Sequence, residues 1–285
     1  MTHHESSLSG AGGIRIYWQS FLPEGEPRAV VVIAHGAGEH SGRYLHVARR
    51  LVADGYAVYA LDHRGHGRSE GPRAVIDRMD SAVADLDSLV VLAAGEHPAT
   101  QTFLLGHSMG GAISLCYAIA HQDRLAGLIL SGALAALEAA SPPQRMIARV
   151  LSALAPRLGI VAVDSKQVSR DPAVVTAYDE DPLVHHGKLP ARLVSELASA
   201  IDSFPDAVGA IAIPTLILYG TADELVPPHG SVMLSERIGA QDKTLKAYDG
   251  LYHEILNEPE QDQVLDEISS WLGAHVRPRD QIGSR

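Results

Sequence analysis

The chain alternates short runs of valine, isoleucine and leucine with longer amphipathic segments, and this pattern restricts its fold more than any other feature. A continuous apolar run of roughly five residues is typical of a parallel strand that is buried on both faces. Such runs predict strands over residues 29–34, 57–61, 103–105, 127–130, 215–219 and 244–248. Residues 14–19 predict one further strand, which we expect at an antiparallel edge of the same sheet.

Between several of these strands, apolar side chains recur at the spacing of one helical face. The three clearest stripes are Tyr44, Val47, Ala48 and Leu51; Val83, Leu86 and Val90; and Val264, Ile268, Trp271 and Leu272. Each stripe can cover a sheet with its apolar face. Strands that alternate with such helices predict an α/β fold, with a mostly parallel central sheet flanked by helices.

One of the predicted strands runs directly into a serine flanked by glycines. Ser108 lies between Gly106 and Gly110, where the apolar run 103–105 turns abruptly into a helix. This arrangement is typical of a nucleophile elbow, in which side chains at the two glycine positions would collide as strand and helix approach. The sequence therefore predicts an exposed, nucleophilic hydroxyl at the N-terminus of a helix.

A reactive serine needs a base and an acid that orients the base. His253 lies in a glycine-broken loop after the last predicted strand, and Asp223 follows the strand before it. The chain order Ser, Asp, His is that of an α/β-hydrolase. We therefore predict Ser108 as nucleophile, His253 as base and Asp223 as the orienting acid, with the adjacent Glu224 as the rival acid.

The same chemistry needs donors for the negative charge that develops on the attacked carbonyl oxygen. In this architecture one donor is the backbone N–H that follows the nucleophile, which is Met109 here. The second comes from the loop after an early strand, and Ala37 in the glycine-rich segment His35–His40 matches it best. We predict these two backbone groups as the oxyanion hole.

The strand and helix alternation fails between residues 133 and 212. We expect an inserted helical segment there, called the cap, on a core formed by residues 1–132 and 213–275, with a disordered tail over 276–285. Five apolar side chains of the cap share one helical spacing: Met146, Ile147, Val150, Leu151 and Leu154. This face either packs on the body or belongs to a lid that lines an acyl-chain tunnel and touches a lipid surface.

Composition restricts the partners and the compartment. The net charge of −11 argues against binding nucleic acid, whose phosphates require basic patches. A single cysteine allows no internal disulfide, and the first residues contain no basic region followed by an apolar core, so we expect a cytoplasmic protein. His63 and His66 lack matching third and fourth ligands at a suitable spacing, so we expect a hydrogen-bonded polar loop there, with no metal site and no cofactor.

Together these motifs resemble those of the monoacylglycerol lipases, particularly the actinobacterial members. The blocks that carry the resemblance are His35–Tyr44, Asp62–Ser69, Gly106–Gly111 and the pair Tyr252-His253. The similarity extends from about Gly10 to Ala274. It implies hydrolysis of monoglycerides to fatty acid and glycerol by Ser108, Asp223 and His253.

The resemblance also implies a polar pocket for the glycerol headgroup, formed by Glu39, Arg43 and Tyr178. The chain departs from mammalian relatives at Leu256, where they carry a histidine of this pocket, and Asn257 stands beside it. A lysophospholipase or a broad carboxylesterase would use the same catalytic residues. A non-catalytic α/β-hydrolase relative that acts as a ligand receptor would normally lack part of them.

Overall fold

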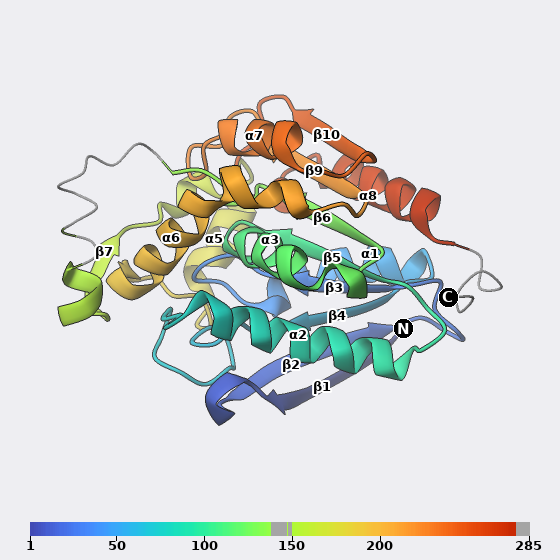
Figure 1. Cartoon of the computed structure of the whole chain (residues 1–285), viewed down its shortest axis with the longest axis horizontal. Helices are drawn as coiled ribbons and strands as arrows, with labels where there is room; N and C mark the ends of the chain where they lie inside the picture. Colours follow the sequence, from blue (N-terminus) through green and yellow to red (C-terminus); the bar gives the residue numbers. More distant parts are fainter. Residues whose placement is uncertain (138–146, 148–149, 278–285) are drawn as a thin grey trace.

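A computed structural model describes residues 1–137, 147 and 150–277 of the chain (Figure 1). An eight-stranded sheet forms its centre, in the spatial order β1-β2-β4-β3-β5-β6-β9-β10. These strands are β1 (Thr2–Ser9), β2 (Arg15–Leu22), β3 (Val30–Ala34), β4 (Ala57–Leu61), β5 (Thr102–His107), β6 (Gly127–Ser131), β9 (Thr215–Gly220) and β10 (Lys243–Tyr248). The α-helices are α1 (Leu45–Ala53), α2 (Met79–Glu96), α3 (Met109–His121), α5 (Pro172–Glu180), α6 (Ala191–Ala207), α7 (His229–Arg237) and α8 (Gln261–His275).

The six strands from β4 to β10 in this order are parallel to one another, and each corresponds to a predicted apolar run. Successive side chains of such a strand point to opposite faces of the sheet. In β3, Val30 and Val32 accordingly belong to one apolar cluster and Val31 and Ile33 to the other. The predicted α/β class with a mostly parallel sheet is therefore confirmed.

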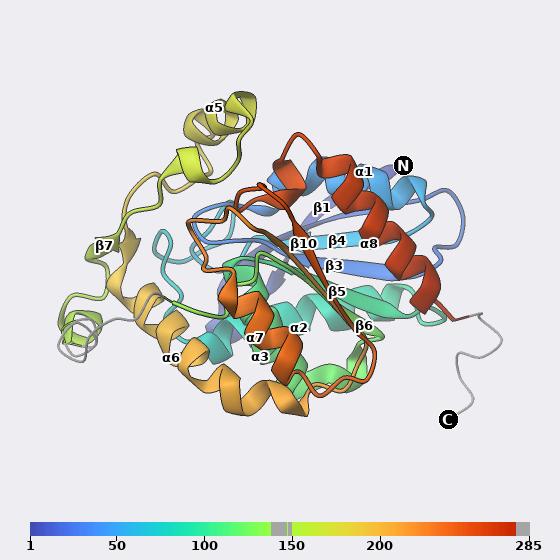
Figure 2. The same ribbon diagram turned by 90° about the horizontal axis from the view of Figure 1, so that it is seen from above.

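Helices cover both faces of the sheet. Figure 2 shows α1 and α8 on one side and α2, α3, α6 and α7 on the other. The three predicted apolar stripes are buried in these helices and in the turn before α1: Tyr44, Val47, Ala48, Leu51, Val83, Leu86, Val90, Val264, Ile268, Trp271 and Leu272. The apolar stripes thus face the sheet, as their spacing predicts.

The prediction that residues 14–19 form an edge strand is wrong in one respect. β2 is antiparallel, but it pairs on both sides, with β4 and with β1, and β1 forms the edge. β1 has a polar sequence and is almost wholly exposed, so it carries no apolar alternation from which a strand could be predicted. It is held by pairing along its whole length and by contacts such as the stacking of His3 on Phe21 at 4.4 Å.

The cap segment 133–212 divides into two parts. α6, at its end, packs against α3, and its apolar face from Leu193 to Phe204 belongs to the main core. The preceding part contains α5 and the antiparallel pair β7 (Gly159–Val161) and β8 (Leu189–Pro190), and α5 and β7 lie toward one end of the molecule (Figure 2). Of the predicted cap stripe, Met146 lies outside the described residues; Ile147 and residues 150–154 are helical.

The predicted disordered tail begins within the described part of the chain. Val276 packs against the α1 and α8 cluster, and the Arg277 N–H donates to Gln101 Oε1 at 2.6 Å. The rest of that tail, residues 278–285, lies outside the described residues. Among the helices of the described part, none has the length and apolar character needed to cross a bilayer.

Candidate active site

Ser108 lies at the carboxyl end of the central strand β5 and directly before α3. Its backbone adopts φ 53° and ψ −120°, a conformation that non-glycine residues rarely adopt. A side chain at Gly110 would collide with the backbone of Ala34, and one at Gly106 with Ser114 and Gly110. The two glycines are therefore required by close approach of backbone and helix, as the elbow motif predicts.

Ser108, His253 and Asp223 form one hydrogen-bonded chain. His253 Nε2 lies 2.9 Å from Ser108 Oγ, and His253 Nδ1 lies 2.7 Å from Asp223 Oδ2. The backbone N–H groups of Leu225 and Val226 donate to the other carboxylate oxygen of Asp223 at 2.9 and 2.8 Å. The carboxylate is thus held from two sides and keeps the imidazole pointing at the serine.

The rival acid, Glu224, points elsewhere. Its side chain is exposed and its Oε2 accepts a hydrogen bond from Gln167 Nε2 at 2.9 Å. The side chain of Asp223 is only 2% exposed. Of the two neighbouring carboxylates, the structure therefore brings Asp223 to the histidine.

The environment of His253 makes it a stronger base than a free imidazole. Burial opposes the charged imidazolium, but the carboxylate of Asp223, together with those of Glu254 and Glu39, outweighs burial and raises the pKa of His253 above its ordinary value of 6.5. A neutral histidine in contact with a serine hydroxyl and with a raised pKa is suited to remove the hydroxyl proton.

The two predicted oxyanion donors come from different elements that meet at Ser108. Met109 begins α3, so its N–H is one of the groups that a helix leaves without an internal partner. Ala37 lies in the loop after β3 and lines the same cavity as Ser108. This loop is held by Glu39, whose Oε1 accepts from the Gly36 N–H at 2.6 Å, and by the His185 N–H, which donates to Gly38 O at 2.7 Å.

The three predicted headgroup residues lie together beside the catalytic chain. Arg43 Nη1 donates to Glu39 Oε2 at 2.7 Å, and the Arg43 guanidinium lies 4.8 Å from the ring centre of Tyr178. Burial would raise the pKa of Glu39, but the Arg43 charge, together with His107, His35 and the hydrogen bond from Tyr44, outweighs it and lowers that pKa to about 2. Glu39 is therefore a carboxylate at neutral pH.

Glu254 belongs to the same cluster and was missed by the sequence analysis. Its two carboxylate oxygens each accept from Arg43, through Nη1 and Nη2, at 2.7 Å. Leu256, where the resemblance implies the loss of a pocket histidine, is buried in the apolar core, and Asn257 Nδ2 donates to Glu254 Oε2 at 2.9 Å. Glu254, which follows His253 directly, therefore adds a second carboxylate to the cluster around Arg43.

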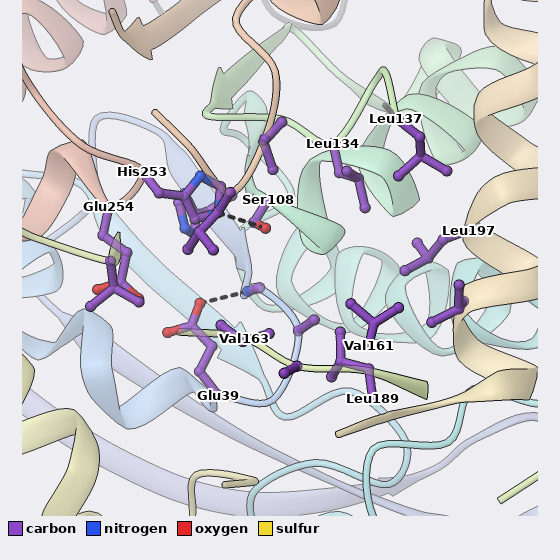
Figure 3. Close-up of a pocket in the computed structure, with 18 of the residues that line it drawn as sticks. Glu39, Ser108, Leu134, Leu137, Val161, Val163, Leu189, Leu197, His253 and Glu254 are labelled. Atoms are coloured by element: carbon purple, nitrogen blue, oxygen red, sulfur yellow. Dashed lines mark hydrogen bonds between the residues drawn. The ribbon is translucent and has the colours of Figure 1, made fainter. Parts of the chain in front are cut away.

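A cavity of about 170 Å³ opens over Ser108. Figure 3 shows His253, Glu39 and Glu254 on one side of the serine and the leucines on the other. Most of the remaining lining is aliphatic: Leu134, Leu137, Val161, Ala162, Val163, Val168, Leu189, Val194, Leu197, Leu225 and Val226. The cap supplies much of this wall. The cavity therefore has a polar end and an apolar end, with the nucleophile between them.

The loop 62–69 forms hydrogen bonds with the segment that follows β3. Asp62 Oδ1 accepts from the N–H and the hydroxyl of Ser41 at 2.8 and 2.6 Å, and the His63 N–H donates to His35 Nε2 at 2.9 Å. Arg64 pairs with the buried Asp85 through Nε and Nη2. These contacts give the hydrogen-bonded loop that was expected. In the described part of the chain, His, Cys, Asp and Glu side chains form no group of three or more that could hold a metal ion.

Comparison with known proteins agrees with this geometry. A family model described as "Serine aminopeptidase, S33" matches residues 25–260. A monoacylglycerol lipase from Mycolicibacterium smegmatis is 46% identical over 96% of this chain and 99% of its own, and the human monoglyceride lipase is 37% identical over 93% and 89%. The crystal structure of Paleococcus ferrophilus monoacylglycerol lipase matches with a TM-score of 0.82 and 34% identity, over 91% of this chain and 99% of its own. The chain therefore belongs to the monoacylglycerol lipase family of α/β-hydrolases and resembles its actinobacterial members.

Proposed function

We propose that this protein is a carboxylic ester hydrolase that cleaves monoacylglycerols to fatty acid and glycerol. The observation that carries the proposal is the hydrogen-bonded chain Ser108, His253 and Asp223 at the floor of a cavity with one polar and one apolar end. A monoacylglycerol has the same division, with a polar glycerol and an apolar chain on either side of its ester. The names and the full-length similarity of the relatives support this substrate class.

The reaction begins with attack of Ser108 Oγ on the ester carbonyl while His253 Nε2 takes the hydroxyl proton. The C–O bond to glycerol then breaks, and the imidazolium returns the proton to the departing glycerol oxygen. Water attacks the resulting acyl-enzyme, with His253 again taking a proton. Collapse of the second intermediate breaks the bond to Ser108, which recovers its proton, and releases the fatty acid.

The N–H groups of Met109 and Ala37 stabilise the oxyanion in both tetrahedral intermediates. Loss of one such donor typically costs about 3 kcal/mol of transition-state stabilisation. The contacts from Glu39 to Gly36 and from His185 to Gly38 hold the Ala37 loop in place before substrate arrives. Because this backbone is already ordered, little reorganisation accompanies the reaction.

The polar and apolar ends orient the substrate. Glu39, Arg43 and Tyr178 lie at the end that would accept the glycerol hydroxyls. The aliphatic wall accepts the acyl chain, since each buried methylene contributes about 0.8 kcal/mol. This orientation places the ester carbon next to Ser108.

We further propose that the outer part of the cap, meaning the described residues between 137 and 161, contacts the lipid surface from which the substrate is taken. Its apolar side chains are strongly exposed: Leu137, Ile147, Val150, Leu154, Leu158 and Val161. Leu154 is 81% exposed and Ile147 58% exposed. Leu137 and Val161 also line the cavity, which connects this apolar surface with the acyl end. The protein would then act peripherally at a membrane or lipid droplet on the cytoplasmic side.

A release assay with the purified protein tests the function. Fatty acid release is measured from monoacylglycerols of increasing chain length and from lysophosphatidylcholines with the same chains. We expect release from monoacylglycerols without added metal and after chelation, with much slower release from lysophosphatidylcholine. Equal or faster cleavage of lysophosphatidylcholine would favour a lysophospholipase, and hydrolysis of short esters alone would favour a broad carboxylesterase. A complete lack of hydrolysis, with ligand binding retained, would indicate a receptor.

A further inference from the structure

Glu254 is a buried charge in the active-site cavity that the reaction itself does not use. It follows His253 directly, is only 5% exposed as a residue, and lines the cavity beside Glu39 (Figure 3). Its carboxylate receives two donors of Arg43 at 2.7 Å each. Such a bidentate, charge-assisted pair is formed by an ionised carboxylate.

The pairing reduces the capacity of Arg43 to bind a further anion. Nη1 donates to both Glu39 and Glu254, and Nη2 donates to Glu254, so three of the five N–H donors of the guanidinium are already used. The guanidinium also lies over the ring of Tyr178. The cluster contains two carboxylates and one guanidinium, so its net charge is negative although an arginine lies at its centre. A site that used arginine to bind a phosphate would keep the guanidinium donors open.

We propose that Glu254 is a specificity-determining residue, which keeps the headgroup end selective for an uncharged polyol and rejects a headgroup that carries a phosphate monoester. The inference rests on the proposed function, because it concerns the headgroup of the same substrate class. Glu254 acts in two ways: its charge repels the phosphate, and its two hydrogen bonds occupy two guanidinium donors that could otherwise pair with the phosphate.

Electrostatics in a buried site give this discrimination its strength. A phosphate monoester carries between one and two negative charges at neutral pH. Charges a few ångströms apart interact several times more strongly in a protein cavity than in water, because the surroundings screen them less. An uncharged glycerol headgroup does not experience this repulsion, and its hydroxyls can still donate hydrogen bonds to the carboxylate oxygens of Glu39 and Glu254.

The test compares two substrates that differ only in the phosphate, 1-oleoylglycerol and 1-oleoylglycerol 3-phosphate, both presented in uncharged detergent micelles. Glu254→Gln removes the charge and preserves the shape. We expect the ratio of kcat/KM for the phosphate over that for the neutral substrate to rise about tenfold or more. Glu254→Asp, which retains the charge, should keep the wild-type ratio. The net negative charge of the protein repels the phosphate substrate in every variant. Its contribution cancels when the ratio for Glu254→Gln is compared with the ratio for another variant that loses one carboxylate.

Glu258→Gln is the matched control. Glu258 is also buried, also pairs with an arginine (Arg170), and lies four positions along the same loop, but it does not line the cavity. A purely structural effect on the loop would lower kcat/KM for both substrates by the same factor and leave their ratio unchanged. We expect this result for Glu258→Gln. Thermal unfolding monitors the fold of every variant, and Glu254→Met supplies a second uncharged variant if the glutamine variant does not fold.

The outcomes separate the inference from the proposed function. An unchanged ratio in folded Glu254→Gln or Glu254→Met would overturn the role of Glu254, as would an equal rise in Glu258→Gln. Failure of the wild-type protein to hydrolyse 1-oleoylglycerol would instead overturn the proposed function. A raised ratio together with a wild-type protein that cleaves the neutral substrate would support both.

Discussion

The body of the protein and the outer part of its cap use their side chains in opposite ways. In the body, the loops near the nucleophile contain buried polar pairs, such as Asp62 with Ser41 and Arg64 with Asp85. In the outer cap, apolar side chains such as Ile147 and Leu154 face solvent instead of a core. The body therefore holds its polar groups in fixed positions, whereas the outer cap presents an apolar surface to solvent.

This difference separates two kinds of variant. A change in the catalytic chain of the body should affect every ester equally, because all esters share the same transition-state charge. A change on the outer cap should affect only substrates that reach the site from an aggregated lipid phase.

Replacement of the nucleophile should have the largest effect. Ser108→Ala should reduce kcat by about 10⁶-fold on both long-chain and short-chain esters, because the covalent step is lost. Ser114→Ala is a suitable control, since Ser114 lies in α3, which follows the nucleophile, and its hydroxyl is buried with no hydrogen-bond partner among the described residues. Comparable turnover by Ser108→Ala and the wild-type protein would contradict the assignment.

Removal of the orienting carboxylate should follow. Asp223→Asn should lower kcat by about 10⁴-fold, because an amide no longer stabilises the imidazolium or its correct tautomer. Glu224→Gln should remain within a few fold of the wild-type activity, since its side chain bonds to Gln167 at the surface. The assignment of the two acids is reversed if the Glu224 variant proves to be the inactive one.

The pH dependence of the reaction reports the environment of His253. Burial lowers the pKa of His253, but Asp223 together with Glu254 and Glu39 raises it above 6.5. The imidazole is therefore protonated and unable to accept the serine proton below that raised value. We expect kcat/KM to fall about tenfold per pH unit on the acid side, with a midpoint above 6.5. Burial lowers the pKa of the neighbouring His107 to about 4, so it does not titrate in this window. A midpoint at or below 6.5 would contradict this expectation and show that burial outweighs the carboxylates around His253.

The outer cap should produce the smallest and most selective effect. Ile147→Ser combined with Leu154→Ser should reduce hydrolysis of emulsified long-chain monoacylglycerol several-fold, while a soluble short-chain ester changes less than twofold. Val91→Ser combined with Val232→Ser on the body is the control, since these residues are 48% and 37% exposed. Equal losses on both substrates, together with a lower melting temperature, would show that the face stabilises the fold and does not contact lipid.

Most of the parallel sheet could be predicted because its signal is local. A buried strand such as β4 is apolar at every position, and the predicted range 57–61 coincides with it. β1 could not be predicted in this way, since its residues are exposed and polar and only the neighbouring β2 makes them a strand. The surroundings of the apolar cap side chains could not be predicted either. Helical spacing shows that these side chains share one face of a helix, but not whether that face contacts the protein core or solvent.

The candidate site divides along the same line. The elbow at Ser108 could be predicted from the sequence, because glycines at 106 and 110 reflect a local steric requirement. The sequence also favoured Asp223 over its neighbour Glu224 as the acid, but the contact of Asp223 with His253 is seen in the folded chain alone. The pairing of Glu254 with Arg43, 211 residues away, left no signal in the sequence. A charged side chain on a loop belongs to no periodic pattern, so its partner depends on which distant loops the sheet brings to one edge.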